Sequence, residues 1–528
     1  MMNKYFLFLY FFIIFSISFF LGWINIFFLP LSFLVVYLLY FNQDIAKEKI
    51  KIKKYFIIIP IIIFLVSRFV PFLSSPHPLG YDTGFYNYNI EKERIIIQEN
   101  NKSKRGVVQK KSKNIIGLNL VDKFNLVEVE SVGSRYITKS LIKIGLNNWI
   151  ILYAFYILMG FITGVLIYFV VKEFFNKEAA FFSFLIYSLS TVQYVSYWNM
   201  LWKHAIGLNL ILLVLLLLEK NKNIYKYFFI PILIIILIFT HKTSAILLLI
   251  ILSIYLILNY KSNKFFIFVF IIIVLIATYI YNDLFIYLWR QYISGFSYYY
   301  DFFSVKEGVF MDIKDYLYKA VVYLPFGILG FLNYAKLKKQ KSIVLLFIIT
   351  AFLVSIKFIF YKRLIIYFDI ALIIFSGYMF YQFLSVVKNK LNKYIFNIIM
   401  IVFLAIGIIL LYNEVQIKKP LLEKNAINNI VDIKSIYPQT EIFVFDSYFT
   451  PWLYGFSGHK IFAPGWGDED WDLEKWIDFW NSDDSRKIDI LEERNKEYII
   501  FTSRGFMEIE DDRLLNINNN FLYFGNNL

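Results

Sequence analysis

The sequence predicts a polytopic α-helical membrane protein of about thirteen transmembrane helices, with a small exterior α/β domain at its C-terminus. Three observations support this fold class. Of the 528 residues, 59% are hydrophobic and 21% are aromatic, which exceeds the usual composition of soluble domains. The apolar residues gather into runs long enough to cross a bilayer. From Tyr412 onward the composition changes to 21 acidic and 12 basic residues. We therefore expect a membrane domain over residues 1–411 and a separate exterior domain over 412–528.

The apolar runs give the predicted spans in order. They cover Tyr5–Leu21, Ile24–Tyr40, Tyr55–Phe72, Trp149–Val171, Ala179–Tyr197, Ala205–Leu218, Tyr227–Thr240, Ser244–Tyr260, Phe265–Tyr281, Val321–Tyr334, Ser342–Phe360, Leu364–Leu384 and Tyr394–Leu411. The first run follows a lysine but has no small-residue cleavage site behind it. We therefore interpret it as a retained helix rather than a removed signal peptide.

Lysine clusters predict the orientation of these spans. They occupy every second loop, at Lys47–Lys54, Lys172–Lys177, Lys220–Lys226, Lys261–Lys264, Lys336–Lys341 and Lys388–Lys393. Cytoplasmic loops carry an excess of Lys and Arg, so we expect this side and the N-terminus to be cytoplasmic. An odd number of spans then places the C-terminus on the exterior face of the plasma membrane.

Charge and cysteine content exclude several function classes. The formal charge of +15 comes from lysines in short loops rather than from a basic docking face, so we expect no nucleic-acid partner. The chain contains no cysteine, which excludes disulfides, thiolate catalysis and cysteine metal sites.

Two predicted exterior regions are long enough to fold. Residues 74–148 form the first exterior loop, in which Glu91–Gln98 and Tyr136–Leu146 have the spacing of amphipathic helices lying in the membrane interface. In the tail, Glu441–Asp446 and Tyr498–Thr502 are typical of short buried strands, and Asp472–Trp480 of an amphipathic helix.

The first exterior loop begins with the motif Gly80–Tyr86 (GYDTGFY). Its carboxylate, Asp82, is a candidate general base that would take the proton of an acceptor hydroxyl. Tyr81, Phe85 and Tyr86 offer flat faces for stacking on a sugar. The alternative is structural: Asp82 makes an Asx turn between glycines, and the aromatic residues form an interface belt.

Cationic pairs form the second candidate group. Each pair stands at the predicted exterior end of a span: Lys203 and His204, His241 and Lys242, and Lys362 and Arg363. Arginine presents a planar donor fork to phosphate oxygens and lysine a point charge, so these residues are candidates for binding a lipid phosphate. The alternative is that they only anchor helix ends in the interface. Asp369, one to two turns below Arg363, is expected to pair with a cation.

An acidic cluster in the tail is the third candidate. Asp468, Glu469, Asp470 and Asp472 could bind a divalent ion, but the glycine of an EF-hand loop is missing. An acidic first turn of the predicted helix explains the cluster without a metal, and we favour this explanation. We therefore expect no metal and no other cofactor.

These motifs and the span pattern resemble the GT-C superfamily of membrane glycosyltransferases, which includes oligosaccharyltransferase catalytic subunits, protein O-mannosyltransferases and aminoarabinose transferases. His77–Tyr86 is similar to their first-loop motif, Thr240–Ser244 to their Thr-His turn, and Lys362–Asp369 to their late arginine segment. The resemblance implies inversion at a polyprenyl-phosphate sugar donor with Asp82 as base.

The departures from that pattern limit what the resemblance implies. The Trp198–His204 turn has no acid where oligosaccharyltransferases hold a divalent ion, and the tail lacks their Trp-Trp-Asp motif. Thr83 follows Asp82 where the O-mannosyltransferases have Glu. Neither a metal requirement nor an acceptor class carries over.

We therefore expect a glycosyltransferase that moves a sugar from a polyprenyl-phosphate donor to an exterior glycan, lipid or protein acceptor at the membrane. Arg363, Lys362, His241, Lys203 and His204 are its expected phosphate-binding residues. A transporter or flippase of lipid-linked saccharides and a non-catalytic envelope-assembly scaffold are the alternatives. The few prolines and nearly charge-free span centres argue against a transporter.

Overall fold

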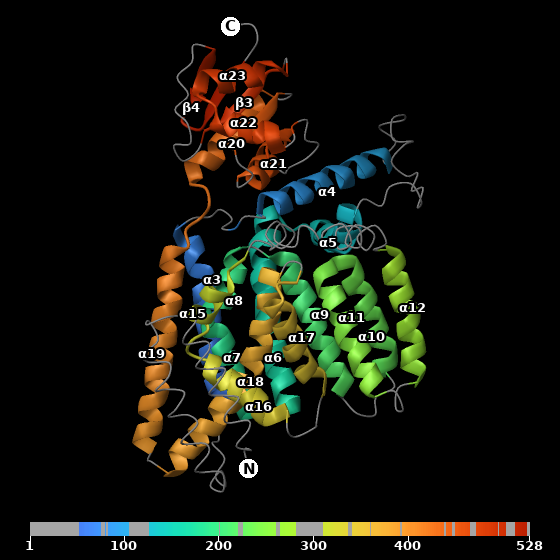
Figure 1. The fold of residues 1–528 in the computed structure, drawn as a ribbon, viewed down its shortest axis with the longest axis vertical. Coiled ribbons are helices and arrows are strands. Elements are labelled where there is room, and N and C mark those ends of the chain that lie inside the picture. The colour runs from blue at the N-terminus through green and yellow to red at the C-terminus, as the bar shows by residue number, and fades with distance from the viewer. Residues whose placement is uncertain are drawn as a thin grey trace. The chain divides into compact units, whose positions relative to one another are not determined.

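A computed structural model describes residues 52–74, 80, 83–104, 126–199, 201–219, 225–259, 264–280, 310–335, 341–358, 361–390, 393–437, 440–445, 449–464, 471, 473–494, 496–502 and 513–524. The chain divides into two compact units (Figure 1). The first unit comprises Met1–Pro71, Asn114–Ile137 and Phe155–Lys418. The second unit comprises Phe72–Lys113, Thr138–Ala154 and Lys419–Leu528. The predicted spans Tyr5–Leu21 and Ile24–Tyr40 lie outside the described residues.

The first unit is a helix bundle. Its elements are η2 (Lys54–Ile57), α3 (Ile58–Ser74), the first part of α5 (Leu126–Lys143), α6 (Phe155–Phe174), α7 (Lys177–Leu189), α8 (Thr191–Trp198), α9 (Trp202–Glu219), α10 (Tyr225–Thr240), α11 (Lys242–Leu258), α12 (Lys264–Ile280), α15 (Ile313–Lys319), α16 (Leu324–Ala335), α17 (Lys341–Ser355), α18 (Tyr361–Lys390) and α19 (Lys393–Ile417). Every predicted span that falls on described residues is helical.

By strict length and composition, only some of the apolar helices in the described part of the chain qualify as membrane spans. In the described part of the chain, four helices are long and apolar enough to cross a membrane, or up to six if each bent pair is one span. The bent pairs are α7 with α8, at 51°, and α15 with α16, at 94°. Helices α3, α10, α11, α12 and α17 are apolar but shorter. The protein is therefore an integral membrane protein with several apolar helices.

Helix α18 forms the centre of this bundle. It packs against α7, α16 and α17, and nearly all of its apolar stretch is buried. Helix α6 packs against α7 and α9, and α10 packs against α9 and α11. In contrast, most of α19 is exposed in the described structure, as expected for a helix whose apolar side chains face lipid.

The second unit contains a mixed five-stranded sheet of order β2-β1-β3-β5-β4. Its elements are α4 (Thr83–Lys104), the end of α5, η3 (Ile150–Ala154), α20 (Lys424–Ile436), β1 (Glu441–Val444), α21 (Thr450–Ser457), β2 (Ile461–Phe462), α22 (Leu473–Asn481), α23 (Asp484–Glu492), β3 (Tyr498–Phe501), β4 (Leu514–Asn518) and β5 (Phe521–Phe524). Strand β1 is parallel to β2 and β3, whereas β5 is antiparallel to β3 and β4.

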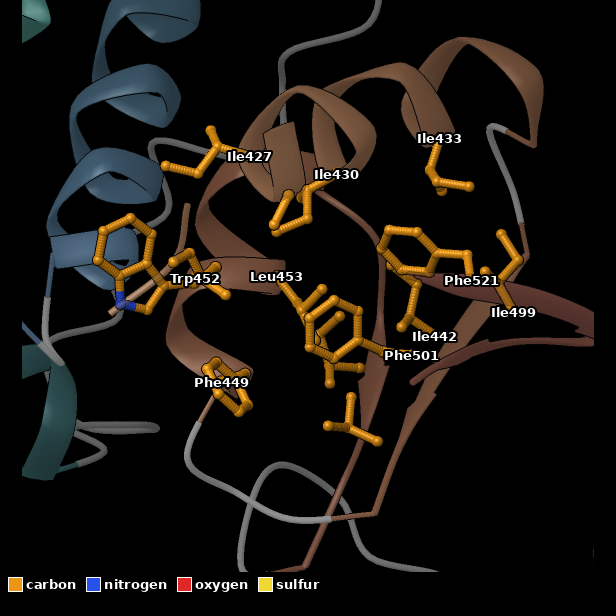
Figure 2. Packing of buried hydrophobic residues seen from close by; sticks show 14 of the residues in the cluster. Ile427, Ile430, Ile433, Ile442, Phe449, Trp452, Leu453, Ile499, Phe501 and Phe521 are labelled. Carbon is orange, nitrogen blue, oxygen red and sulfur yellow. The ribbon is translucent and has the colours of Figure 1, made fainter. Parts of the chain in front are cut away.

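Apolar side chains cover both faces of this sheet. On one face, Ile442, Ile499 and Phe521 pack against α20 and α21, as Figure 2 shows. On the other face, Phe443 and Ile500 pack against the tryptophans and aliphatic residues of α22 and α23. Burial on both faces explains why β1 and β3 read as continuous apolar runs without alternation.

Three predicted elements of the tail are confirmed. The strand predicted at Glu441–Asp446 is β1, the strand at Tyr498–Thr502 is β3, and the helix at Asp472–Trp480 is α22. Both helices predicted in the first loop exist, but α4 is longer than expected and begins at Thr83, inside the glycine motif. The predicted boundary at residue 411 falls within α19.

Candidate functional site

Three helices of the bundle begin at the same place. His204 is the third residue of α9, Ser244 the third of α11, and Tyr367 lies in the second turn of α18. His204 Nδ1 and Tyr367 Oη are 3.0 Å apart, and the Tyr367 hydroxyl also hydrogen-bonds the Ser244 hydroxyl. The first turns of α9, α11 and α18 therefore meet; we call this the three-helix cluster.

His241 joins the cluster through the turn that precedes α11. It is the N-cap of that helix, and its Nδ1 accepts a hydrogen bond from the Ser244 amide at 3.3 Å. The His241 ring centroid lies 4.0 Å from that of His204, in an edge-on arrangement. Both histidines are buried, at 2% and 3% exposure. Sequence reasoning named both as phosphate-binding candidates, and they contact each other directly.

Gly207 permits this close meeting of α9 and α11. A Cβ at Gly207 would lie 2.2 Å from the Ser244 hydroxyl oxygen and 3.5 Å from His241 Nδ1. The first of these separations is far below van der Waals contact, so a larger residue would push α11 away. This requirement could not be predicted from the sequence, because a single glycine within an apolar run is common.

The predicted cations stand in the first turns of the same helices. Lys203 and Arg363 are partly buried. Arg363 lies four residues before Tyr367 on α18, so the two side chains share a helix face. Lys362 is differently placed, because its Nζ lies 2.9 Å from the carboxylate of Asp312.

Asp369 differs from the expectation that it pairs with a cation. Its carboxylate is fully buried and accepts hydrogen bonds from Gln193 at 2.7 Å, Tyr323 at 2.6 Å and Ser190 at 3.3 Å, all neutral donors. Ser190 marks the bend between α7 and α8, and Tyr323 precedes α16 at the other bend. Among the described residues the carboxylate thus binds neutral donors at two helix breaks, where the N-terminus of α8 adds partial positive charge.

The motif Gly80–Tyr86 is described only in part. Asp82 and Tyr81 lie outside the described residues, as does the side chain of Phe85, and Tyr86 is buried at 6% exposure. Within the second unit, Gly84 packs on α21: a Cβ at Gly84 would lie 1.9 Å from the Pro451 carbonyl oxygen. A Cβ at Gly455 would lie 1.8 Å from the Gly84 oxygen. Gly84 therefore allows the close backbone contact between α4 and α21.

Side-chain contacts strengthen that helix pair. Asn87 Nδ2 donates to the Gly455 carbonyl at 3.1 Å, and Tyr88 lies 4.1 Å from Tyr454 between ring centroids. Asn148 in turn donates to Asn87 Oδ1 at 3.2 Å. The residues that directly follow Asp82 are thus fixed to the C-terminal part of the chain.

One buried cation was missed by sequence reasoning. Arg68 lies in α3 and is 1% exposed. It is a charge inside a predicted span, and this signal alone marks a functional candidate in a membrane protein.

The acidic cluster Asp468, Glu469, Asp470 and Asp472 lies outside the described residues. Across the described ranges, no group of three or more His, Asp and Glu side chains is placed to hold a metal ion.

Part of the bundle is similar to a known protein family. The model of the dolichyl-phosphate-mannose-protein mannosyltransferase family matches residues 130–281, a segment that includes His204 and His241. No curated protein sequence matches the chain.

Two solved structures share the fold at low sequence identity, and a third is less similar. The Archaeoglobus fulgidus oligosaccharyltransferase in complex with Zn and sulfate has a TM-score of 0.56 at 12% identity, over 84% of this chain and 67% of that chain. AglB of the same organism, in complex with an inhibitory peptide and a dolichol-phosphate, has a TM-score of 0.54 at 13% identity. The match covers 84% of this chain and 69% of that chain. ArnT from Cupriavidus metallidurans bound to undecaprenyl phosphate has a TM-score of 0.46 at 11% identity. The match covers 89% of this chain and 97% of that chain. The family model and the fold confirm the resemblance to GT-C membrane glycosyltransferases.

Proposed function

We propose that this protein is a GT-C-type glycosyltransferase that moves a sugar from a polyprenyl-phosphate donor to an acceptor on the exterior face of the membrane. The observation that carries the proposal is the three-helix cluster. Helix N-termini carry partial positive charge and favour anions, so cations in a first turn are normally unfavourable. Here α9, α11 and α18 place Lys203, Lys242 and Arg363 in their first turns. Such an accumulation of positive potential is what a phosphate group requires.

The cluster suits the leaving group of the proposed reaction. As the bond between the anomeric carbon and the phosphate oxygen breaks, negative charge grows on the departing polyprenyl phosphate. Fixed positive groups that meet this developing charge lower the barrier, whereas uniform binding of the lipid tail does not. Arg363 is the foremost candidate because its planar fork can bind two phosphate oxygens. Lys362 ranks lower because Asp312 already neutralises it.

Asp82 is the proposed general base. It would take the proton of the acceptor hydroxyl while that oxygen attacks the anomeric carbon and the phosphate leaves from the opposite side, with inversion. Tyr81 and Phe85 remain candidates for stacking on the sugar, whereas Tyr86, the third candidate, is buried. The fixed position of Gly84 on α21 supports this role, because a base must be held steadily to be efficient.

Partners and orientation follow from the same proposal. AglB, whose fold this chain shares, was solved with a dolichol-phosphate, which supports a lipid phosphate as donor carrier. We place the N-terminus in the cytoplasm and the 412–528 region outside on the basis of the lysine pattern. The proposal includes no metal and no other cofactor, and it leaves the sugar and the acceptor open.

Substitution of Arg363 tests the proposal. In proteoliposomes supplied with polyprenyl-phosphate sugars, we expect Arg363→Ala to weaken donor use by more than about tenfold, since a lost charge-assisted contact costs roughly 1.5–3 kcal/mol. Arg363→Lys should restore only part of the loss, because lysine lacks the fork. Lys177→Ala, at the N-terminus of α7 and largely exposed, is the matched control and should act as wild type. Equal effects of Arg363→Ala and Lys177→Ala would show that Arg363 only anchors a helix end.

A further inference from the structure

Arg68 is a buried cation whose contacts within the described residues are all neutral. Its Nη1 donates to the Ser67 hydroxyl at 2.7 Å and to the Ser188 carbonyl at a long 3.4 Å. Its guanidinium carbon lies 4.7 Å from the Phe64 ring centroid and 5.5 Å from that of Tyr194. Its Nε has no hydrogen-bond partner there. A buried charge that lacks both a counter-charge and a full set of hydrogen bonds is costly, and in membrane proteins it marks function.

A cavity adjoins this arginine. Its walls come from α3, α6, α7, α8, α9 and α18, and they include Arg68, Tyr156, Tyr187, Tyr197, Gln193 and His204. About 30 Å³ is open to the centres of water-sized molecules, which is room for about two waters. The cavity can therefore hold one small polar group, of the size of a phosphate or carboxylate, but no sugar.

Most polar groups of the cavity wall already donate elsewhere. The hydroxyls of Tyr156, Tyr187 and Tyr197 donate to the backbone carbonyls of Ser196, Gly160 and Arg68. Gln193 donates to Asp369.

Two buried nitrogens of the lining residues have no hydrogen-bond partner among the described residues. His204 uses Nδ1 toward Tyr367, and its Nε2, like Nε of Arg68, has no partner among the described residues. Both side chains line the same cavity. A buried guanidinium and an imidazole whose Nε2 can carry a proton, both on the wall of one small cavity, favour an oxyanion as its occupant.

We propose that this cavity binds a phosphate group between Arg68 and His204. The phosphate is either that of a polyprenyl phosphate or free phosphate. In the first case the site deepens the proposed function and rests on it, because His204 also belongs to the three-helix cluster and would connect the cavity to the cations of α9 and α18. Arginine suits this position because its fork keeps two donors in one plane even when one of them bonds protein.

Ligand-dependent stability tests the site. The full-length protein in detergent micelles is heated with inorganic phosphate, with undecaprenyl phosphate, or with uncharged undecaprenol as the lipid control. We expect at least one phosphate-bearing ligand to raise the Tm of the wild type, and undecaprenol to leave it unchanged. Stabilisation by both phosphates identifies free phosphate as sufficient, and stabilisation by undecaprenyl phosphate alone identifies the lipid. If neither phosphate raises the Tm beyond undecaprenol, the proposal is wrong.

Variants then locate the binding. Arg68→Gln should weaken the apparent affinity by roughly 10- to 100-fold, while Lys177→Gln should keep it. If Arg68 only stabilises the fold, through its bond to the Ser188 carbonyl near the end of α7, Arg68→Gln would lower the Tm without ligand but leave the phosphate affinity unchanged. That outcome overturns the proposal. If Arg68→Gln does not fold, His204→Gln replaces it, with the same expected loss and the same refuting outcome.

The result is separable from the proposed function. Loss of phosphate binding in Arg68→Gln, in a protein without transferase activity, would uphold the site and refute the enzyme. Full phosphate affinity in Arg68→Gln, in a protein whose wild type transfers sugar, would refute the site alone.

Discussion

The structure determines whether Gly455→Ala stabilises or destabilises the protein. The new Cβ would lie 1.8 Å from the carbonyl oxygen of Gly84, 2.3 Å from its carbonyl carbon and 2.5 Å from its Cα. All three are backbone atoms and cannot rotate away. Helices α21 and α4 must therefore separate, by about 1 Å or more, before an alanine fits.

The magnitude follows from three terms. Overpacking of this kind costs about 1–3 kcal/mol. Weakening the hydrogen bond from Asn87 to the Gly455 carbonyl costs about 1 kcal/mol more. Alanine is a better helix former than glycine by about 1 kcal/mol, which offsets part of the loss. The net result is a destabilisation of the α4–α21 contact by about 1–3 kcal/mol. Without the contact, the same substitution would stabilise α21.

Hydrogen exchange of the full-length protein measures the effect locally. We expect the amides of α4 to exchange about 5- to 150-fold faster in Gly455→Ala, because the opening equilibrium shifts by that factor. Gly407→Ala is the matched control, since its Cβ would meet only the flexible side chain of Leu189, at 3.0 Å or more. Unchanged or slower exchange of α4 in Gly455→Ala would refute the contact between the two helices.

Two further predictions concern the membrane orientation and the stability of the bundle. A cysteine at position 468 should react with an impermeant maleimide in intact cells and one at 339 should not; labelling of 339 alone would reverse the predicted orientation. The chain has no cysteine of its own, so the labelling has no background. Asp369→Asn should lower the stability of the detergent-solubilised protein by about 1.5–3 kcal/mol, since it removes a charged acceptor from Gln193, Tyr323 and Ser190. Thermal unfolding measures this, and a wild-type Tm would show that the two helix breaks do not depend on the carboxylate.

The sequence was sufficient for the bundle helices and for β1, β3 and α22, because their signals are local, whereas β2, β4 and β5 were not predicted. Apolar runs located the bundle helices, and short apolar segments located β1 and β3. Bends were not visible, because Ser190 and Tyr323 acquire their meaning only from Asp369 on a distant helix. For the same reason the partner of Asp369 was wrongly expected to be a cation.

The candidate site was predictable to a similar extent. His204 and His241 could be named because polar pairs at helix ends interrupt apolar sequence. Their direct contact, and the dependence on Gly207, come from helix packing that residue spacing does not encode. The contact of Gly84 with Gly455 joins residues far apart in the chain, and nothing local to either glycine indicates it. Arg68 carried a local signal, a charge inside a span, that the sequence reading passed over.

Sugar transfer by Asp82→Asn tests the central proposal most directly. The asparagine keeps the size of the side chain and can still form an Asx turn, but it cannot accept the proton of the acceptor. Release of polyprenyl phosphate from polyprenyl-phosphate sugars, measured in membranes that contain the acceptor, should fall by about 10²–10⁴-fold. Binding of polyprenyl phosphate should persist, and Glu91→Gln in the same loop should keep most of the activity. Transfer at the wild-type rate in Asp82→Asn, or its loss in Glu91→Gln instead, would contradict the assignment of Asp82 as the base.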